Sequence, residues 1–513
     1  MTLGEAHDMR VVLIEAGTPG LNVYSHVAMG RGTPLLATVL RDAGYEVRAV
    51  VEDVSGKDSI DWGAVADARI VGFSAITCTM PRTVDLMRKV RAVNPRSPIV
   101  LGGPHPTCEP VRSLDAGADF VVRGEGELAF PRLCSALLGG DPPLDTIAGL
   151  VWREAGEIHH GPEPRQLTAA ELDSLPHVDY SLVHHASKAS VGWAWRARGC
   201  PKRCDFCEVC RIWPHYRARS VEKSVEEVLA TQDAGYASTF LIDDNAAADK
   251  PAFKKMLAML AERGFARTLV TQIRADAVFE RDGSLDTELL RLLRRAATVT
   301  FVCVGVESAS DANLSKIDKG IDSAAMARAL RAMRRYGLIV HGMFIALAED
   351  TAGIIRRNGA YARKYVHSLQ YLFEVPLPGT SRTSEHRRAG RLLFTDDHDL
   401  SYYDGMHIVL RPLAMSATQM QHLVVEQYRR FYSVSRIVAT AIRSLFGRVR
   451  LLGPAQRAYL RRFPIGQRVY WWARLHVEQM LAPVAALVTG HRRVKAFMAE
   501  EGYRDYLHRL DAV

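Results

Sequence analysis

The sequence predicts an α/β protein with an open parallel sheet, a partial barrel and a mainly helical C-terminal region. Three observations support this. Apolar strands alternate with helical stretches at 9–138, a second alternation fills 189–395, and the strand pattern disappears over 396–513. Such alternation is typical of parallel sheets covered by helices. Residues 139–188 are rich in proline, glycine and aspartate, so we expect a connector there.

The first unit begins with a continuous apolar run at 10–16, as expected for a strand buried on both faces. Helical spacing follows at 34–45 and at 81–93. Further strands are expected at 46–51, 68–75, 98–103 and 119–126. Ligands bind at the carboxyl ends of strands in such sheets. The candidate positions there are Ser74, Thr77, Gly102, Gly103, His105, Gly124, Glu125 and Gly126.

The second unit contains six apolar strands, and at least one helical stretch separates each neighbouring pair. They are expected at 191–197, 239–244, 268–273, 299–307, 338–346 and 369–375. This pattern predicts a parallel barrel that stays open, because a closed barrel needs eight such units. Functional residues are expected at the carboxyl ends of these strands. In the connector, a hairpin is expected to turn near Gly156.

The composition is that of an ordinary globular protein. Of 513 residues, 48% are hydrophobic and 24% are charged, which excludes wholesale disorder, collagen and coiled coil. Eight cysteines are too few for a disulfide-dense secreted scaffold. No signal peptide is evident, and no apolar run reaches the roughly 18 residues that span a bilayer. We therefore expect a cytoplasmic protein.

Positive charge is concentrated near the C-terminus. The net charge is +9, and residues 421–513 alone hold 16 Lys and Arg against 6 Asp and Glu. The rest of the chain is close to neutral, so no nucleic-acid partner is expected.

The sharpest motif is a group of cysteines directly after the first barrel strand. Cys200, Cys204 and Cys207 have the spacing CxxxCxxC, which suits an iron–sulfur cluster or zinc. Three ligands on a four-iron cluster would leave one iron free to bind a substrate or cosubstrate. Cys210 could instead close the site. A structural zinc site or a plain electron-transfer cluster remains the alternative.

The segment from Cys200 to Cys207, with Phe206 before the last cysteine, resembles the signature of radical S-adenosylmethionine (SAM) enzymes. Segments over about 9–431 are similar, in order, to those of the cobalamin-binding branch, in particular hopanoid methylases and the anaerobic porphyrin cyclase. The resemblance implies a [4Fe–4S] cluster on the three cysteines. It also implies that SAM binds the open iron and is cleaved to a 5′-deoxyadenosyl radical.

The resemblance also assigns residues to SAM. Phe206 would flank the adenine, and Asp243 or Asp244 would lie near the amino group. Arg274, with Glu307 and Ser308, would serve the carboxylate and the ribose. Each could instead form an ordinary ion pair or cap. The fifth strand departs from the family pattern, because Ala346 and Ala348 stand where glycines are expected.

A further element of the family, YRxRS, is matched by Tyr216 and Arg219 after the cysteines. The alternative is a helix lead-in with Ser220 as the N-cap.

The N-terminal unit resembles a cobalamin-binding domain, and its small strand-end residues would let the cofactor approach the backbone. An empty or nucleotide-binding flavodoxin-like sheet is the alternative. The motif D-x-H-x-x-G, whose histidine ligates cobalt, is absent. His26 has the wrong flanks, and His105 would at most touch the corrin edge. We therefore expect cobalamin without a lower histidine ligand.

The resemblance implies a methyltransferase that methylates an unactivated carbon. One SAM would methylate cobalt, and a second would give the radical that activates the substrate, which then takes the methyl group from methylcobalamin. A cyclase, oxidase or rearrangement enzyme is the alternative within the family. More distant alternatives are a methylthiotransferase that modifies tRNA and a cobalamin- or cluster-based sensor. The expected partners are a small-molecule or lipid-like substrate and an electron donor of flavodoxin or ferredoxin type.

The C-terminal region contains two features with alternative interpretations. Residues 402–416 resemble an element of the hopanoid methylases and would close over the substrate or form a structural turn; its marked positions are Asp404, Gly405, His407 and Pro412. Basic helices containing Trp471, Trp472 and Leu481 would either contact a membrane surface or pack on the core.

Overall fold

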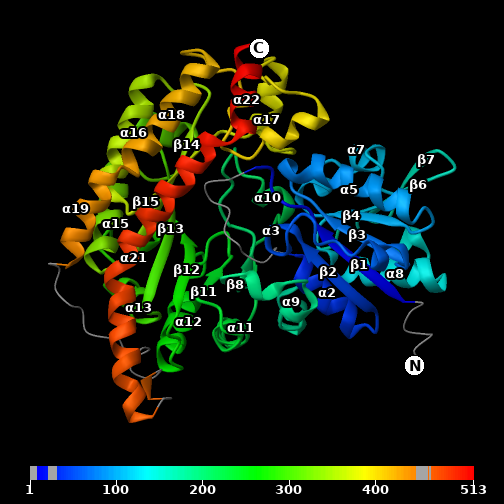
Figure 1. Cartoon of the computed structure of the whole chain (residues 1–513), viewed down its shortest axis with the longest axis horizontal. Coiled ribbons are helices and arrows are strands. Elements are labelled where there is room, and N and C mark those ends of the chain that lie inside the picture. Colours follow the sequence, from blue (N-terminus) through cyan, green and yellow to red (C-terminus); the bar gives the residue numbers. More distant parts are fainter. Residues whose placement is uncertain (1–8, 21–31, 446–459, 462–463, 513) are drawn as a thin grey trace.

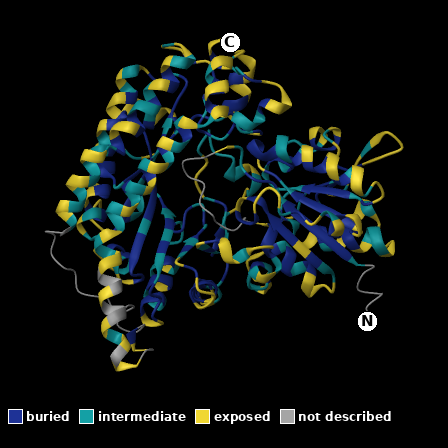
Figure 2. Ribbon diagram, viewed as in Figure 1, coloured by how far each residue is buried: buried dark blue, intermediate teal, exposed yellow. Residues whose placement is uncertain are grey.

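The computed structural model describes residues 9–20, 32–445, 460–461 and 464–512. Two parallel sheets lie side by side, and the C-terminal helices pack on the far side of the second sheet (Figure 1). Buried residues run along the strands of both sheets, whereas exposed residues lie on the outer helices (Figure 2). The predicted fold class, an open sheet followed by a partial barrel and a helical region, is confirmed.

The first sheet has seven strands in the order β2-β1-β3-β4-β5-β6-β7. Their bounds are β1 (Arg10–Glu15), β2 (Glu46–Val51), β3 (Ile70–Ser74), β4 (Ile99–Gly102), β5 (Phe120–Val122), β6 (Leu150–Glu154) and β7 (Glu157–His160). The first five are parallel, and β6 and β7 are antiparallel. The hairpin expected in the connector therefore extends this sheet. It turns at Gly156, whose φ of 91° suits glycine.

Helices cover both faces of the first sheet. On one face, α2 (Thr33–Asp42) and α8 (Gly126–Gly139) bury Leu40 and Phe130. On the other, α5 (Met80–Val93) and α7 (Pro110–Asp115) bury Leu86 and Leu114. The strand order reverses between β1 and β3, and such a reversal opens a crevice at the carboxyl ends of the strands.

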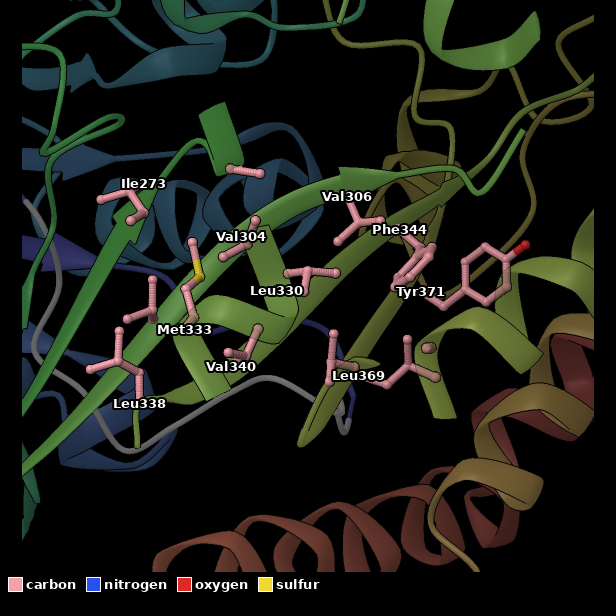
Figure 3. Packing of buried hydrophobic residues seen from close by; sticks show 14 of the residues in the cluster. Ile273, Val304, Val306, Leu330, Met333, Leu338, Val340, Phe344, Leu369 and Tyr371 are labelled. Carbon is pink, nitrogen blue, oxygen red and sulfur yellow. The ribbon is translucent and has the colours of Figure 1, made fainter. Parts of the chain in front are cut away.

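The second sheet has six parallel strands in sequential order and is not closed into a ring. They are β8 (Val191–Ala194), β11 (Ser238–Leu241), β12 (Thr268–Ile273), β13 (Val299–Glu307), β14 (Ile339–Ala346) and β15 (Ser368–Phe373). The helices between them are α11 (Val221–Asp233), α12 (Lys250–Glu262), α13 (Thr287–Arg295), α14 (Asp311–Lys316), α15 (Ser323–Arg335) and α16 (Ala352–Tyr365). Leu330 and Met333 of α15 pack against Val304 of β13 in the core (Figure 3). All six strands predicted from the sequence are present.

The C-terminal region is helical, as predicted. Helix α17 (Ser381–Arg388) precedes it, and it contains α18 (Ala417–Phe431), α19 (Val434–Leu445), α21 (Ile465–Ala499) and α22 (Glu501–Asp511). No helix in the described ranges is both long enough and apolar enough to cross a membrane.

Tyrosine hydroxyl groups cap both edges of the second sheet. Tyr428 accepts a hydrogen bond from Tyr371 N at 2.6 Å and donates to Tyr371 O at 3.1 Å. Tyr432 binds Leu369 N and O of the same edge strand β15 in the same way, at 2.9 and 2.8 Å. At the opposite edge, Tyr180 binds Trp193 N and O of β8 at 3.1 and 2.7 Å. The backbone of each edge strand is thereby partly satisfied without another strand.

Replacing Tyr428 by phenylalanine should lower the free energy of unfolding by about 1–3 kcal/mol, because it removes two hydrogen bonds to buried backbone groups of β15. Thermal and denaturant unfolding would measure the loss. Tyr365 is a buried tyrosine of α16, which is not an edge strand, and it provides the matched Tyr365→Phe control. An equal loss in both variants would contradict the capping role.

Candidate active site

A short hairpin holds the cysteine loop. Strand β9 (Ala197–Arg198) pairs in an antiparallel manner with β10 (Arg217–Ala218), and the loop runs between them. Gly199 starts the loop with a φ of 83°. A Cβ atom there would come within 2.8 Å of His215 O, so the closure of this loop requires glycine.

The three cysteines of the signature lie half-buried in this loop. Burial raises the pKa of Cys207 to about 12. Burial also raises the pKa of Cys204, although the charges of Lys319 and Arg274 partly oppose the rise. Cys210 lies on α10 (Val209–Ile212), and its thiol faces Cys207 O at 3.6 Å. Phe206 is half-buried between Cys204 and Cys207.

The donor chemistry of this loop fits an iron–sulfur cluster, because three thiols gather in one loop near two cationic side chains that favour thiolates. Within the described ranges, no three His, Cys, Asp or Glu side chains form a group that could hold a single metal ion. The fit of this loop to an iron–sulfur cluster therefore rests on its three thiol groups.

A buried lysine lies beside the cysteines. Lys319 Nζ forms an ion pair with Glu307 Oε1 at 2.7 Å, and both side chains are less than 10% exposed. Arg274 donates to Lys319 O at 2.5 Å and pairs with Asp276 at 2.9 Å. The sequence did not single out Lys319. A lone lysine in a loop carries no periodic signal, and its role becomes visible only through the contact with Glu307.

The backbone of Glu307, which holds this ion pair, has a strained conformation. Glu307 has a φ of 61°, which is uncommon for a residue other than glycine, and it lies at an irregularity between β13 and β14. A side chain on Gly305 would collide with the Glu307 carboxylate and approach Lys319 Nζ to 2.8 Å. Strained residues cluster at functional sites, where the surrounding structure holds them.

The two aspartates after β11 have different environments. Asp243 is buried, and its Oδ1 accepts hydrogen bonds from Arg196 N at 2.7 Å and Ala197 N at 3.0 Å. Its Oδ2 has no hydrogen-bond partner among the described residues, and burial raises its pKa to about 6. Asp244 lies close enough to Cys207 to raise the pKa of that thiol. Asp243 thus holds the backbone that leads into the cysteine loop, and one of its carboxylate oxygens stays available for a ligand.

Ser308 is engaged within the protein. Its hydroxyl donates to Asn358 Oδ1 at 3.3 Å and accepts from Ser310 N at 3.2 Å. It thereby orders the loop after β13.

The YRxRS element braces the hairpin. Tyr216 accepts a hydrogen bond from Arg196 at 2.8 Å, and Arg219 forms a buried ion pair with Glu227 at 2.7 Å. Ser220 is the N-cap of α11 and accepts from Lys223 N at 3.3 Å, as the alternative interpretation expected.

The segment after β15 reaches the cysteine loop from the other side. Arg382 of α17 pairs with Asp205 at 3.8 Å and also with Glu374 at the end of β15. Burial would raise the pKa of Glu374, but hydrogen bonds from His386 and Arg382 outweigh it and lower the pKa to about 2. This buried ion network ties the loop to the last barrel strand. The network has no signal in the sequence, because its members come from distant segments.

In the first sheet, the strand ends that are predicted to hold cobalamin are closely packed. Thr77 and His105 are buried, and Thr77 Oγ1 lies 3.1 Å from His105 Nδ1. Burial lowers the pKa of His105 to about 4, so the ring is neutral at neutral pH. At Gly103, a Cβ atom would come within 2.7 Å of Ala75 O, which only glycine avoids. Ser74 Oγ borders the same position.

The other three glycines predicted at the strand ends have different surroundings. Gly102 ends β4, and the nearest atom to an added Cβ would be Val122 O at 3.5 Å. Gly124 has a φ of 76° and donates to Thr107 Oγ1 at 2.9 Å. Gly126 starts α8 next to Leu36. There is therefore space beside Gly102, whereas a hydrogen bond holds the backbone of Gly124 in place. His26 lies outside the described residues.

Glu125 joins the two sheets. Its carboxylate pairs with Arg198 and Arg217 of the β9–β10 hairpin, both at 2.8 Å, and accepts from Leu167 N at 2.6 Å. Burial alone would raise its pKa, but the hydrogen bond from Arg217 and the charge of Arg198 outweigh it, so the pKa lies below its usual value. The structure thus places this candidate in an ion-pair clamp at the base of the cysteine loop.

The Glu125→Gln variant should lose about 3 kcal/mol of stability, because two largely buried arginines lose a counter-charge. Its pH dependence should also change. The contribution of Glu125 is present above its unfolded pKa of 4.5 and is lost as the pH falls through the lower folded pKa. Thermal unfolding between pH 3 and pH 7, with Glu157→Gln as an exposed control, would measure both effects; a parallel shift at every pH would contradict the clamp.

A cavity of about 320 Å³ lies between the two units. Thr77 and His105 line it from the first sheet, and Pro376, Pro378 and Tyr403 line it from the segment after β15. Its volume is in the range of small-molecule sites, which are common at domain interfaces. Two of the predicted cobalamin residues and the segment after the last barrel strand therefore share one cavity.

The element at 402–416 is anchored inside the protein. Asp404 Oδ1 accepts from Met406 N at 2.7 Å and lies 3.0 Å from His407 Nδ1. His407 packs on the ring of Tyr506 with centroids 4.5 Å apart. Gly405 has a φ of 78°, as a turn requires. These contacts match the structural turn, and Pro412 follows it in the chain.

Two family models match the chain. The model for the B12 binding domain matches residues 18–134, and the model for the radical SAM superfamily matches residues 196–352. The chain thus joins a B12 binding domain to a radical SAM domain. The family resemblance found in the sequence is thereby confirmed, and both matched segments lie inside the predicted units.

Relatives of this radical SAM enzyme include proteins of two named activities. An uncharacterized methyltransferase of Pyrococcus horikoshii is 27% identical over 441 residues, which are 83% of this chain and 92% of that protein. The anaerobic magnesium-protoporphyrin IX monomethyl ester cyclase of Cereibacter sphaeroides is 24% identical over 85% of this chain and 73% of that protein. The structure of the radical SAM methyltransferase TsrM from Kitasatospora setae, with cobalamin and a [4Fe-4S] cluster, has a TM-score of 0.64 at 15% identity, covering 94% and 100% of the two chains. The last comparison shows a shared fold.

Proposed function

We propose that this radical SAM enzyme is a cobalamin-dependent methyltransferase that methylates an unactivated carbon. The observation that carries the proposal is the cavity shared by the B12-binding unit and the segment after the last barrel strand, which reaches the signature cysteine loop through the Arg382–Asp205 ion pair. Named methyltransferases among the relatives and structural neighbours support methyl transfer.

The residues suited to each cofactor lie at the strand ends. Cys200, Cys204 and Cys207 would hold the cluster. When bound, the cluster and SAM supply a radical that removes hydrogen from carbon, and cobalamin supplies the methyl group. The glycine-lined ends of β4 and β5, together with Ser74 and Thr77, would receive cobalamin. A neutral His105 would border it without a charge.

The side chains around the cysteine loop would bind and orient SAM. Asp243 Oδ2 can accept a hydrogen bond from the ammonium group of SAM, and Lys319 can attract the carboxylate of SAM. Arg274 fixes the Lys319 backbone, and Glu307 holds the lysine side chain. Burial of this pair excludes water, which strengthens such charge interactions. Phe206 would pack on the adenine.

The test is anaerobic reconstitution followed by incubation with SAM carrying a deuterated methyl group and with candidate small-molecule and lipid fractions. Iron, sulfide and cobalt bound to the chain, 5′-deoxyadenosine, and a product bearing the deuterated methyl group are the expected results. Zinc in place of iron, or intact SAM under a strong reductant, would contradict the proposal.

A cyclase or oxidase without net methyl transfer is the second candidate, and the relationship to the porphyrin cyclase favours it. In the same experiment it predicts 5′-deoxyadenosine and a changed product without deuterium.

We also propose an external one-electron donor of flavodoxin or ferredoxin type. Lys202 and Arg203, between the first two cysteines, are exposed and would attract an acidic donor. The Lys202→Glu/Arg203→Glu variant should therefore be reduced about tenfold more slowly by flavodoxin at low salt. Reduction by dithionite should be unchanged. Stopped-flow bleaching of the cluster would measure both rates, and an equal loss with both reductants would contradict a docking role.

The basic C-terminal helices support one more partner, a peripheral contact with a membrane. The side chains of Trp471 and Trp472 lie outside the described part of the structure, and the side chain of Leu481 is exposed.

A further inference from the structure

Three helices beside the second sheet carry positive charge and no negative charge. Helices α15, α16 and α19 contain nine arginines, one lysine and no aspartate or glutamate. They lie beside one another on the outer side of the sheet (Figure 1). Because α15 and α16 end just before β14 and β15 begin, their last turns lie at the amino-terminal end of the sheet. The cysteine loop follows the carboxyl end of β8 and so lies at the opposite end.

Two arginine side chains meet at the last turn of α16. Arg436 of α19 donates to Arg363 O at 2.7 Å and to Val366 O at 3.0 Å. Arg334 of α15 donates to Lys364 O at 2.6 Å. The last carbonyl groups of a helix have no partner within the helix and accept such donors. Since these carbonyls belong to one helix end, the two guanidinium groups are held close together.

Two further arginines lie near this pair. Burial, together with the charges of the three other arginines, lowers the pKa of Arg436 to about 10, so its guanidinium remains charged at neutral pH. The three are Arg334, Arg363 and Arg443. Arg443 is exposed, and its printed hydrogen bonds run to atoms of its own helix, at 3.1 and 3.3 Å. These four cationic side chains, from three helices, are called the arginine cluster below.

Little negative charge balances the arginine cluster. Glu426 is close enough to act on Arg363, but it pairs with Arg430 at 2.5 Å. In the described ranges, no carboxylate forms an ion pair with a member of the cluster. The ends of α15 and α16 each supply about half a negative elementary charge, which leaves the cluster with a net charge of about +3. Nε of Arg436 is also buried without a hydrogen-bond partner among the described residues.

We propose that the arginine cluster is a binding site for a phosphate-type dianion. Such an anion supplies the charge that the cluster lacks, and its oxygens can accept hydrogen bonds from guanidinium groups of several helices at once. A carboxylate fits less well, because it has one charge and two oxygens. A bound anion would join α19 to the barrel helices. The inference does not depend on the methyl-transfer chemistry, because the site lies away from the cysteine loop.

Isothermal titration calorimetry of the full, reconstituted chain tests this site with two probes. Inorganic phosphate represents a soluble phosphate compound, and dihexanoyl phosphatidic acid, kept below its micelle concentration, represents a lipid headgroup. We expect at least one probe to bind with one anion per chain, and the tighter probe assigns the source of the phosphate group. The midpoint of thermal unfolding should rise with that probe and not with sodium chloride of equal ionic strength.

Variants of the arginine cluster test which side chains bind the anion. The Arg334→Gln/Arg443→Gln variant should bind the probe about tenfold more weakly, because two charge-assisted hydrogen bonds are lost. The control Arg356→Gln/Arg357→Gln removes two exposed arginines from the first half of α16 and should bind as the unchanged chain does. Arg443→Gln alone, which changes only an exposed side chain, should bind about threefold more weakly and is informative even if the double variant does not fold.

Several outcomes would overturn the proposal. They are the absence of binding of both probes, equal weakening in the double variant and its control, and a thermal midpoint that rises equally with sodium chloride. Circular dichroism and 5′-deoxyadenosine formation should be the same in the variants and the unchanged chain, since the arginine cluster lies outside the cysteine site.

Discussion

The Cys204→Ala variant is expected to lose its iron and to cleave SAM more than about a hundredfold more slowly than the unchanged chain. Cys204 lies in the loop held by Gly199 and the β9–β10 hairpin, next to the cations Lys319 and Arg274. Without its thiolate, the loop offers too few donors for a four-iron cluster. Iron and sulfide content, the electron paramagnetic resonance signal of the reduced protein and 5′-deoxyadenosine formation would measure the loss.

Cys210→Ala is the matched control for this experiment. Its thiol faces Cys207 O within the adjoining helical turn, and we expect the variant to keep about four irons per chain and to cleave SAM. An equal loss of iron from both variants would show that four cysteines close the cluster, which would leave no iron for SAM.

The Lys319→Met variant should bind SAM about 30-fold more weakly, a loss of roughly 2 kcal/mol, because it removes a buried cation beside the cluster loop. It should also destabilise the fold, since Glu307 is left as an unpaired buried charge. Equilibrium binding of SAM and thermal unfolding would measure the two effects separately.

A double variant separates binding from stability. Lys319→Met/Glu307→Gln removes both charges, so stability should recover while SAM binding stays weak. Lys319→Arg keeps the charge and should retain most of the affinity. If SAM binding recovers together with stability in the double variant, Lys319 supports the fold and does not contact the ligand.

The fold was largely predictable because its strands are buried on both faces. Such strands leave continuous apolar runs, as at β13, and the helices between them show regular spacing. The hairpin at Gly156 was predicted as well, but its addition to the first sheet was not. Pairing between β5 and β6 depends on tertiary packing, which a local pattern does not contain.

The candidate site was predictable only where ligands share one loop. The spacing of Cys200, Cys204 and Cys207 is a local signal. In contrast, Lys319 and Arg382 reach the loop from distant segments, and their charges look like ordinary surface charges in the sequence. Glu125 follows a strand end as a cofactor residue would, but the structure pairs it with arginines of the next domain.

The tyrosines at the two ends of the second sheet have a consequence beyond stability. An unclosed sheet normally offers free strands on which another molecule can polymerise, and proteins must block this route. Here the hydroxyl groups of Tyr180, Tyr428 and Tyr432 occupy hydrogen-bonding positions on both edge strands, so a strand of another molecule cannot pair along their full length.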